Sequence, residues 1–213
     1  MKKGITLAIV ISIGIASLFA ACAAPKTTPT PAETPEELLD RASGIASVKY
    51  DQVITAPQMP GESPPWKVWV KGNKMRSEAT YEGQTGVIII DRDAQVAYMY
   101  DPSQNVWTKA DLSGQAVMSM MTMSATEWAK FILSDPTKLV VIGSETVDGK
   151  ACLVVESTDG EGKVKAWFWK EYGLPIRMEM ESFGALIKWE NIEFVSIPDS
   201  MFELPSGVKI QEQ

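Results

Sequence analysis

The residue types that most often carry out acid–base and nucleophilic chemistry are scarce in this chain. Histidine is absent from all 213 residues, which removes the Ser-His and Cys-His nucleophile systems, the usual zinc sites and the commonest general base. Asp91 and Asp93 have the spacing of a cation site, but Arg92 lies between them in a predicted hairpin turn. Ser206 and Lys209 match the S-x-x-K spacing of Ser-Lys enzymes without the companion motifs. We therefore expect no enzyme activity, no metal site and no cofactor.

One of the two cysteines directly follows an N-terminal stretch that has the pattern of an export signal. Lys2 and Lys3 precede an uncharged stretch, residues 4–21, which as a helix would be about 27 Å long. The stretch ends in Leu-Phe-Ala-Ala directly before Cys22, and this ending resembles the lipobox of bacterial lipoproteins. The resemblance implies that residues 1–21 form a signal peptide and that Cys22 becomes a diacylglycerylated mature N-terminus. An uncleaved membrane anchor is the alternative.

The charge of the chain indicates how it meets a membrane. Lys and Arg number 20 and Asp and Glu number 27, so the formal net charge is −7. Removal of residues 1–21 takes away two lysines and leaves a formal charge of −9. This balance argues against nucleic-acid binding, and anionic headgroups should repel the domain from the membrane surface. We expect an exported protein, lipid-anchored at the outer face of the cell membrane or in the periplasm.

The segment after the predicted lipidation site differs in composition from the rest of the chain. Residues 22–34 are rich in Pro, Thr and Ala, which predicts a flexible tether that reaches roughly 35 Å when extended. Residues 35–213 form the predicted folded domain. Hydrophobic residues make up 45% of the chain and charged residues 22%, as in ordinary globular proteins. Cys152 lies in an alternating strand pattern and is interpreted as a small buried hydrophobe.

Hydrophobic periodicity predicts a mostly β domain with two or three short helices. Thr34 and Glu37 form a capping box at the start of one helix, and Ser124 and Glu127 form a second one inside an apolar interruption at 114–134. Elsewhere apolar and polar residues alternate with a period of two, which is typical of half-buried strands. We expect about ten strands, mostly antiparallel, in one sheet that curls over its helices.

Two segments carry a resemblance to a known family. Residues 167–177 contain Trp-Phe-Trp followed by Tyr-Gly-Leu-Pro-Ile-Arg, and residues 199–208 read Asp-Ser-Met-Phe-Glu-Leu-Pro-Ser-Gly-Val. Both resemble the LolA/LolB-like lipoprotein carriers, a superfamily that includes LppX/LprG-type lipid-carrying lipoproteins. The resemblance implies a half-open antiparallel β-barrel whose concave face is closed by short helices around an apolar pocket. RseB-like regulators share this architecture.

Apolar residues supply the candidate binding site. Methionine is concentrated just before the second capping box, and flexible thioethers suit a pocket that adapts to acyl chains, although methionine also fills ordinary cores. The tryptophans either line a cavity or pack against one another. The candidate ligand-binding residues are Met118, Met120, Met121, Met123, Trp128, Ile132, Trp167 and Trp169.

Two functions follow from these patterns. In the first, the chain is a membrane-anchored lipoprotein that binds acyl chains of a lipid or lipoprotein, as a carrier or receptor in envelope transport. In the second, it is an RseB-like envelope sensor, regulator or structural lipoprotein that binds a protein partner. A cavity on the scale of ligand pockets favours the first function, and a collapsed interior favours the second.

Overall fold

The computed structural model describes residues 33–59, 61–112, 122–159 and 162–212. The chain divides into two units, Met1–Ala32 and Glu33–Gln213, and everything described below belongs to the second unit. The predicted signal peptide, Cys22 and most of the tether lie outside the described residues. Within the described ranges, no helix has the length and apolar character needed to span a membrane.

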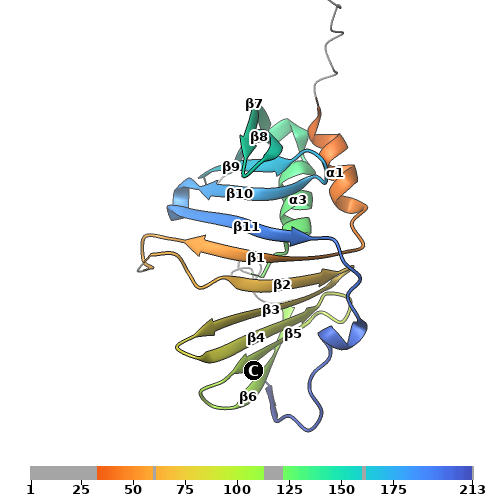
Figure 1. The fold of residues 1–213 in the computed structure, drawn as a ribbon, viewed down its shortest axis with the longest axis vertical. Helices are drawn as coiled ribbons and strands as arrows, with labels where there is room; N and C mark the ends of the chain where they lie inside the picture. The colour runs from red at the N-terminus through yellow and green to blue at the C-terminus, as the bar shows by residue number, and fades with distance from the viewer. Residues whose placement is uncertain (1–32, 60, 113–121, 160–161, 213) are drawn as a thin grey trace, which may run out of the picture. The chain divides into compact units, whose positions relative to one another are not determined.

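The strands of the described residues form a single twelve-stranded sheet (Figure 1) in the order β12-β6-β5-β4-β3-β2-β1-β11-β10-β9-β8-β7. Neighbouring strands are antiparallel except β12 and β6, which are parallel. The sheet remains open, with β12 and β7 at its edges, so the predicted half-open barrel is confirmed. The strands are β1 Ser47–Thr55, β2 Trp66–Lys71, β3 Lys74–Tyr81, β4 Gln84–Asp91, β5 Val96–Asp101, β6 Val106–Asp111, β7 Leu139–Val147, β8 Lys150–Asp159, β9 Gly162–Trp169, β10 Leu174–Met180, β11 Ala185–Glu193 and β12 Ile210–Glu212.

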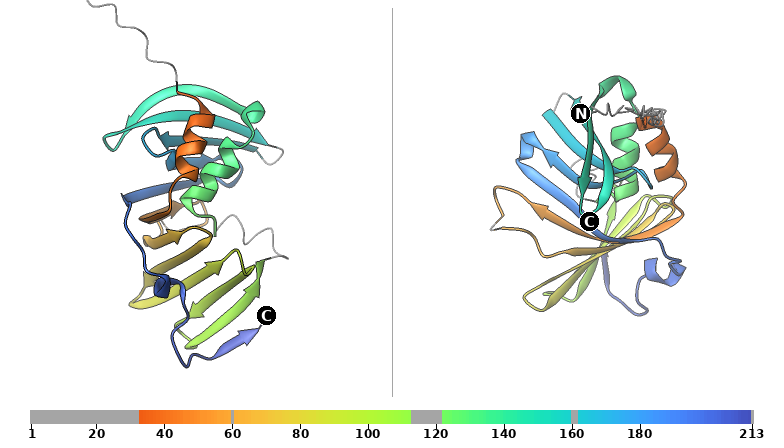
Figure 2. Two further views of the ribbon diagram at one scale, coloured as in Figure 1. Left: turned by 90° about the vertical axis from the view of Figure 1, so that its right-hand side faces the viewer. Right: turned by 45° about the horizontal axis from the view of Figure 1, so that its top comes forward.

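Two α-helices, α1 (Pro35–Ser43) and α3 (Ala125–Leu133), lie side by side on one face of the sheet, over the half that contains β9 and β10 (Figure 2). Both predicted capping boxes are present, at Thr34 and at Ser124. Ser124 itself is extended, with ψ at 163°, so α3 begins at Ala125. Short 3-10 helices complete the described elements: η2 Pro136–Lys138, η3 Glu181–Phe183 and η4 Asp199–Phe202.

The main core fills the space between the two helices and the sheet. Its fully buried large side chains include Trp128 of α3, Leu38 of α1, and Phe168 and Trp189 of the sheet. Burial of each such side chain stabilises the fold by about 1.5–3 kcal/mol. The half of the barrel beneath the helices is therefore a packed interior.

A second apolar cluster lies on the opposite face of the sheet. Ile197 and Phe202 of the C-terminal segment pack against Val87, Ile89 and Trp107, and the segment then ends in β12 beside β6. β12 was not predicted from the sequence, because it has three exposed residues and no apolar alternation. These two clusters, and a third one around Cys152 and Trp167, are all built from residues of Glu33–Gln213. This unit thus has its own core and can be studied without residues 1–32.

Candidate functional site

The sheet face that carries the helices continues beyond them onto strands β1 to β5. Cross-strand pairs link Tyr50 to Val68, Val68 to Ser77, Ser77 to Ile88 and Ile88 to Met99. Directly paired residues point to the same face of a sheet. The five side chains therefore form one row, which is apolar except for the hydroxyl groups of Tyr50 and Ser77.

A cavity of about 210 Å³ lies over this row. Four methionines contribute to it, and none of its twelve described lining residues is ionisable. The volume is below the ~300–1,000 Å³ of drug-sized ligand pockets but above the ~150 Å³ of an engineered cavity that binds benzene. It fits one short apolar chain or the end of a longer one. The lining residues are Gln52, Ile54, Met59, Ser63, Trp66, Val68, Met75, Ser77, Ile88, Met99, Thr122 and Met123.

Hydrogen bonds fix the chain where it leaves this cavity and begins α3. Arg92, in the turn between β4 and β5, donates to the Thr122 carbonyl (3.0 Å) and to Glu127 Oε2 (2.8 Å). The Tyr50 hydroxyl accepts a hydrogen bond from the Ala125 N–H at 2.9 Å. Burial raises the pKa of Tyr50 far above its ordinary value, so the hydroxyl stays neutral. The start of α3 is thereby attached to both β1 and the β4–β5 turn.

The Asp91 carboxylate, next to Arg92 in the chain, stabilises the same turn between β4 and β5. Asp91 Oδ1 accepts hydrogen bonds from the N–H groups of Asp93 and Ala94, both at 3.0 Å. The Ala94 N–H is the main cause of a lowered Asp91 pKa. Over the described residues, no group of three or more Cys, Asp or Glu side chains is placed to hold a metal ion.

The sequence-predicted site residues fall in different places. Met123 lines the cavity. Trp128 and Ile132 belong to the packed core under the helices, where they border a hollow of only about 20 Å³ beside Phe131 and Phe183. Met118, Met120 and Met121 lie outside the described residues.

Trp167 and Trp169 lie on the other face of the sheet. Trp167 packs with Cys152 in a separate cluster, and Trp169 packs against that cluster. The Trp167 indole N–H donates to Glu145 Oε2 at 2.7 Å, and Lys165 Nζ lies 4.6 Å from a Trp167 ring centroid. These interactions account for the aromatic pair without a ligand, and the 210 Å³ cavity includes neither residue.

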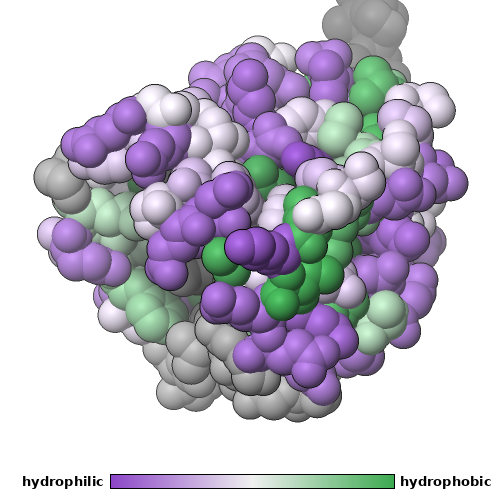
Figure 3. Space-filling model, turned by 90° about the horizontal axis from the view of Figure 1, so that it is seen from below, coloured by the Kyte–Doolittle hydropathy of each residue, from purple (hydrophilic) through white to green (hydrophobic). Residues whose placement is uncertain are grey.

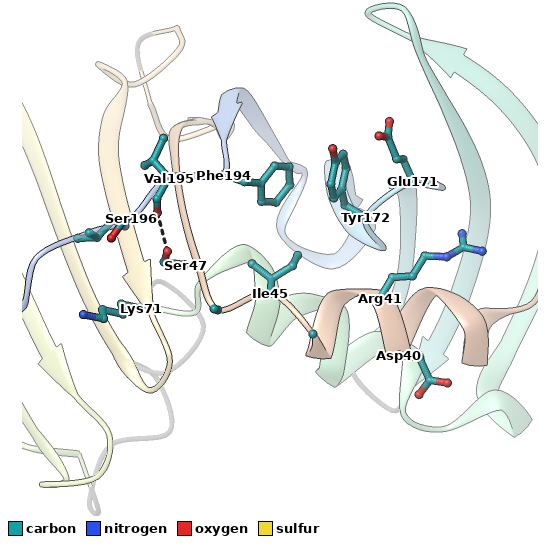
Figure 4. Close-up of a pocket in the computed structure, with 13 residues that line it drawn as sticks. Asp40, Arg41, Ile45, Ser47, Lys71, Glu171, Tyr172, Phe194, Val195 and Ser196 are labelled. Carbon is teal, nitrogen blue, oxygen red and sulfur yellow. Dashed lines mark hydrogen bonds between the residues drawn. The ribbon is translucent and has the colours of Figure 1, made fainter.

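A second hollow, of about 770 Å³, lies beside the end of α1 (Figure 4). Tyr172 and Phe194 stack along it with ring centroids 4.0 Å apart. Its two basic side chains are already paired, Arg41 with Glu33, and Lys71 with Asp199. The hollow is an open groove with mixed lining, unlike the apolar cavity on the helix-bearing face. Seen from below, the surface shows a group of apolar residues near the middle with hydrophilic residues around it (Figure 3).

Sequence reasoning missed most residues of the cavity. Gln52, Ser77 and Met99 occupy inward positions in alternating strands, as their neighbours in the core do. Alternation could have identified their face. It could not have shown that the helices fill one half of the barrel and leave the cavity over the other half.

Comparisons with known proteins found a relative of similar sequence and solved structures of similar fold. No protein-family model matches it. The chain is 28% identical over 218 residues to an uncharacterized protein, MJ0687, of Methanocaldococcus jannaschii, and the match covers 98% of the chain. The chain spans 60% of the length of that relative.

Solved structures with a similar fold come from several bacteria. An uncharacterized conserved protein from Thermus thermophilus has a TM-score of 0.59 at 12% identity, covering 84% of this chain and 98% of the other. A chain of the Pseudomonas aeruginosa MucA/MucB complex has a TM-score of 0.52 at 12% identity, covering 83% and 63%. Lipoprotein LppX of Mycobacterium tuberculosis has a TM-score of 0.49 at 14% identity, covering 76% and 94%. The likeness to the Thermus thermophilus protein and to the chain of the MucA/MucB complex shows a shared fold.

Proposed function

We propose that this chain binds the apolar chain of a lipid or of an acylated protein in the cavity over β1 to β5, as a carrier or receptor in a cell envelope. The observation that supports this function best is the cavity lining, which is mostly apolar, rich in methionine and without ionisable groups among its described residues. Methionine side chains adjust to irregular shapes, which suits chains of different length. We further propose that Cys22 is lipidated and anchors the domain through its tether, and that the protein has no catalytic activity.

The size of the cavity sets the expected strength of binding. At roughly 30 Å³ for a group the size of a water molecule, a volume of 210 Å³ holds about seven methylene-sized groups. Each buried methylene contributes about 0.8 kcal/mol, so the cavity supplies about 5–6 kcal/mol. This corresponds to a Kd on the order of 100 µM before the costs of association. Such binding is reversible, as a carrier requires.

A displacement assay tests this function. An environment-sensitive fluorescent fatty acyl ester should bind the folded protein of residues 33–213 and lose its signal when Met99, which lines the cavity, is changed to Asp. The matched control is Val140→Asp, because Val140 is 61% exposed on the edge strand β7. Circular dichroism checks that each variant is folded. A folded wild-type protein that binds no such probe would contradict the proposal.

Binding of a protein partner is the second candidate function. Two observations favour it: the half of the barrel under the helices is filled, and a chain of the MucA/MucB complex, an assembly of two proteins, has a similar fold. Mass spectrometry of organic extracts from the purified protein separates the two functions. Co-purified lipid supports the first, and an empty extract together with a crosslinked envelope protein supports the second.

A further inference from the structure

Two of the polar side chains that line the cavity make no hydrogen bond within the described residues. Gln52 is 7% exposed and Ser77 is 5% exposed, and both line the cavity. Hydrogen bonds over the ranges that the structure describes involve neither the Gln52 amide nor the Ser77 hydroxyl. Neither group is among the buried polar atoms that lack a partner, so both are accessible from the cavity that they line. A ligand in the cavity can therefore reach both groups and form hydrogen bonds with them.

The other polar lining residues are already engaged. Ser63 Oγ accepts a hydrogen bond from the Ile54 N–H at 3.0 Å, and the Thr122 carbonyl accepts one from Arg92. These bonds hold the β1–β2 loop and the start of α3. Gln52 and Ser77 differ because they project from the middle of β1 and β3, where the backbone is already paired on both sides.

The same lining sets the charge of the ligand. None of the twelve described lining residues carries a charge, so a carboxylate, phosphate or ammonium group inside the cavity would be buried without a counter-ion. Burial of an unpaired charge is strongly unfavourable. An ester, amide or hydroxyl group is neutral and can bond to an amide and a hydroxyl, which both donate and accept.

We propose that Gln52 and Ser77 are specificity-determining residues that select a ligand whose apolar chain carries an uncharged hydrogen-bonding group, such as a fatty ester or amide, over a free fatty acid or a plain hydrocarbon. This inference rests on the proposed function and names the ligand class of the same cavity. Gln52 lies beside Trp66 in the β1–β2 pairing, and Ser77 lies beside Val68 and Ile88. The polar group of the ligand is thus held within an apolar surround.

The test compares three ligands of equal chain length: methyl laurate, lauric acid and dodecane. Each displaces the same fluorescent probe from residues 33–213 at neutral pH. For the wild type, methyl laurate should bind about tenfold more tightly than dodecane, because of its hydrogen bonds. It should also bind at least about tenfold more tightly than ionised lauric acid, because of the buried charge. Gln52→Leu and Ser77→Ala should reduce the advantage of the ester over dodecane to about twofold or less.

Met99→Leu is the matched control, because it changes the lining without removing a hydrogen-bonding group and should shift all three affinities together. The ligand-free variants Gln52→Leu and Ser77→Ala should stay folded and melt close to the wild-type temperature, since neither side chain makes a hydrogen bond in the part of the chain that the structure describes. An ester advantage that survives in both variants would overturn the inference while leaving the proposed function intact. A folded wild-type protein that binds none of the three ligands would overturn both.

Discussion

Replacement of Tyr50 by phenylalanine removes a hydroxyl group that accepts one hydrogen bond from the start of α3. The Tyr50 hydroxyl accepts the N–H of Ala125 at 2.9 Å, and Ala125 is the first residue of α3 and fully buried. That N–H belongs to the first turn, where no intrahelical acceptor exists. The capping hydroxyl of Ser124 accepts the N–H of Glu127 instead. Tyr50→Phe therefore leaves a buried donor without a partner, and the free energy of unfolding should fall by about 1–3 kcal/mol.

Urea denaturation of residues 33–213 measures this loss, with an unchanged m-value showing that the same surface is exposed on unfolding. The melting temperature should fall by roughly 2–4 °C for each kcal/mol. The matched control is Tyr98→Phe, because Tyr98 lies on the other face of the sheet and its hydroxyl has no partner among the described residues. Equal stabilities of Tyr50→Phe and wild type would refute the role of this hydrogen bond in holding α3. Affinity for the fluorescent probe should fall with Tyr50→Phe, because Met123 precedes the loosened helix start.

Three further predictions concern single residues. Trp128 is a fully buried core residue, so Trp128→Ala should lower the free energy of unfolding by about 3–5 kcal/mol. Met99→Ala should lower it by only about 1 kcal/mol. Equal losses of stability in urea denaturation would contradict the division between core and cavity. The Cys152 thiol is buried, and burial raises its pKa to about 11. Iodoacetamide should therefore modify Cys152 at neutral pH only after unfolding, and rapid modification of the native protein, detected by mass spectrometry, would contradict this. A fatty-acid analogue should label the full chain in cells but not Cys22→Ser, and equal labelling of both would exclude Cys22 as the lipidation site.

The helix starts and strand positions could be predicted because they depend on neighbouring residues. Thr34 with Glu37, and Ser124 with Glu127, satisfy each other's backbone groups within one turn. Alternation likewise placed Trp167 and Trp169 on the same strand face as Lys165. It could not decide which side of the sheet that face belongs to, because this depends on where the helices dock.

Other features depend on contacts between distant parts of the chain. Arg92 resembles a solvated turn residue in the sequence, yet it holds Thr122 and Glu127, which are 30 and 35 residues away. The cavity exists because α1 and α3 fill only one half of the sheet face, and no local pattern records that division. The polar character of Gln52 and Ser77 is meaningful only after the structure shows that both face the same cavity.

Photo-crosslinking tests the central claim most directly, because it reports where a bound chain lies. A methyl laurate analogue with a photoreactive group near the end of its chain would be bound to residues 33–213, irradiated and mapped by peptide mass spectrometry. The account predicts label on cavity residues of β2 to β5, such as Trp66, Met75 and Met99, and on Met123 before α3. Label confined to Trp167 and Trp169 on the opposite face of the sheet, or no label above that of an unfolded control, would contradict it.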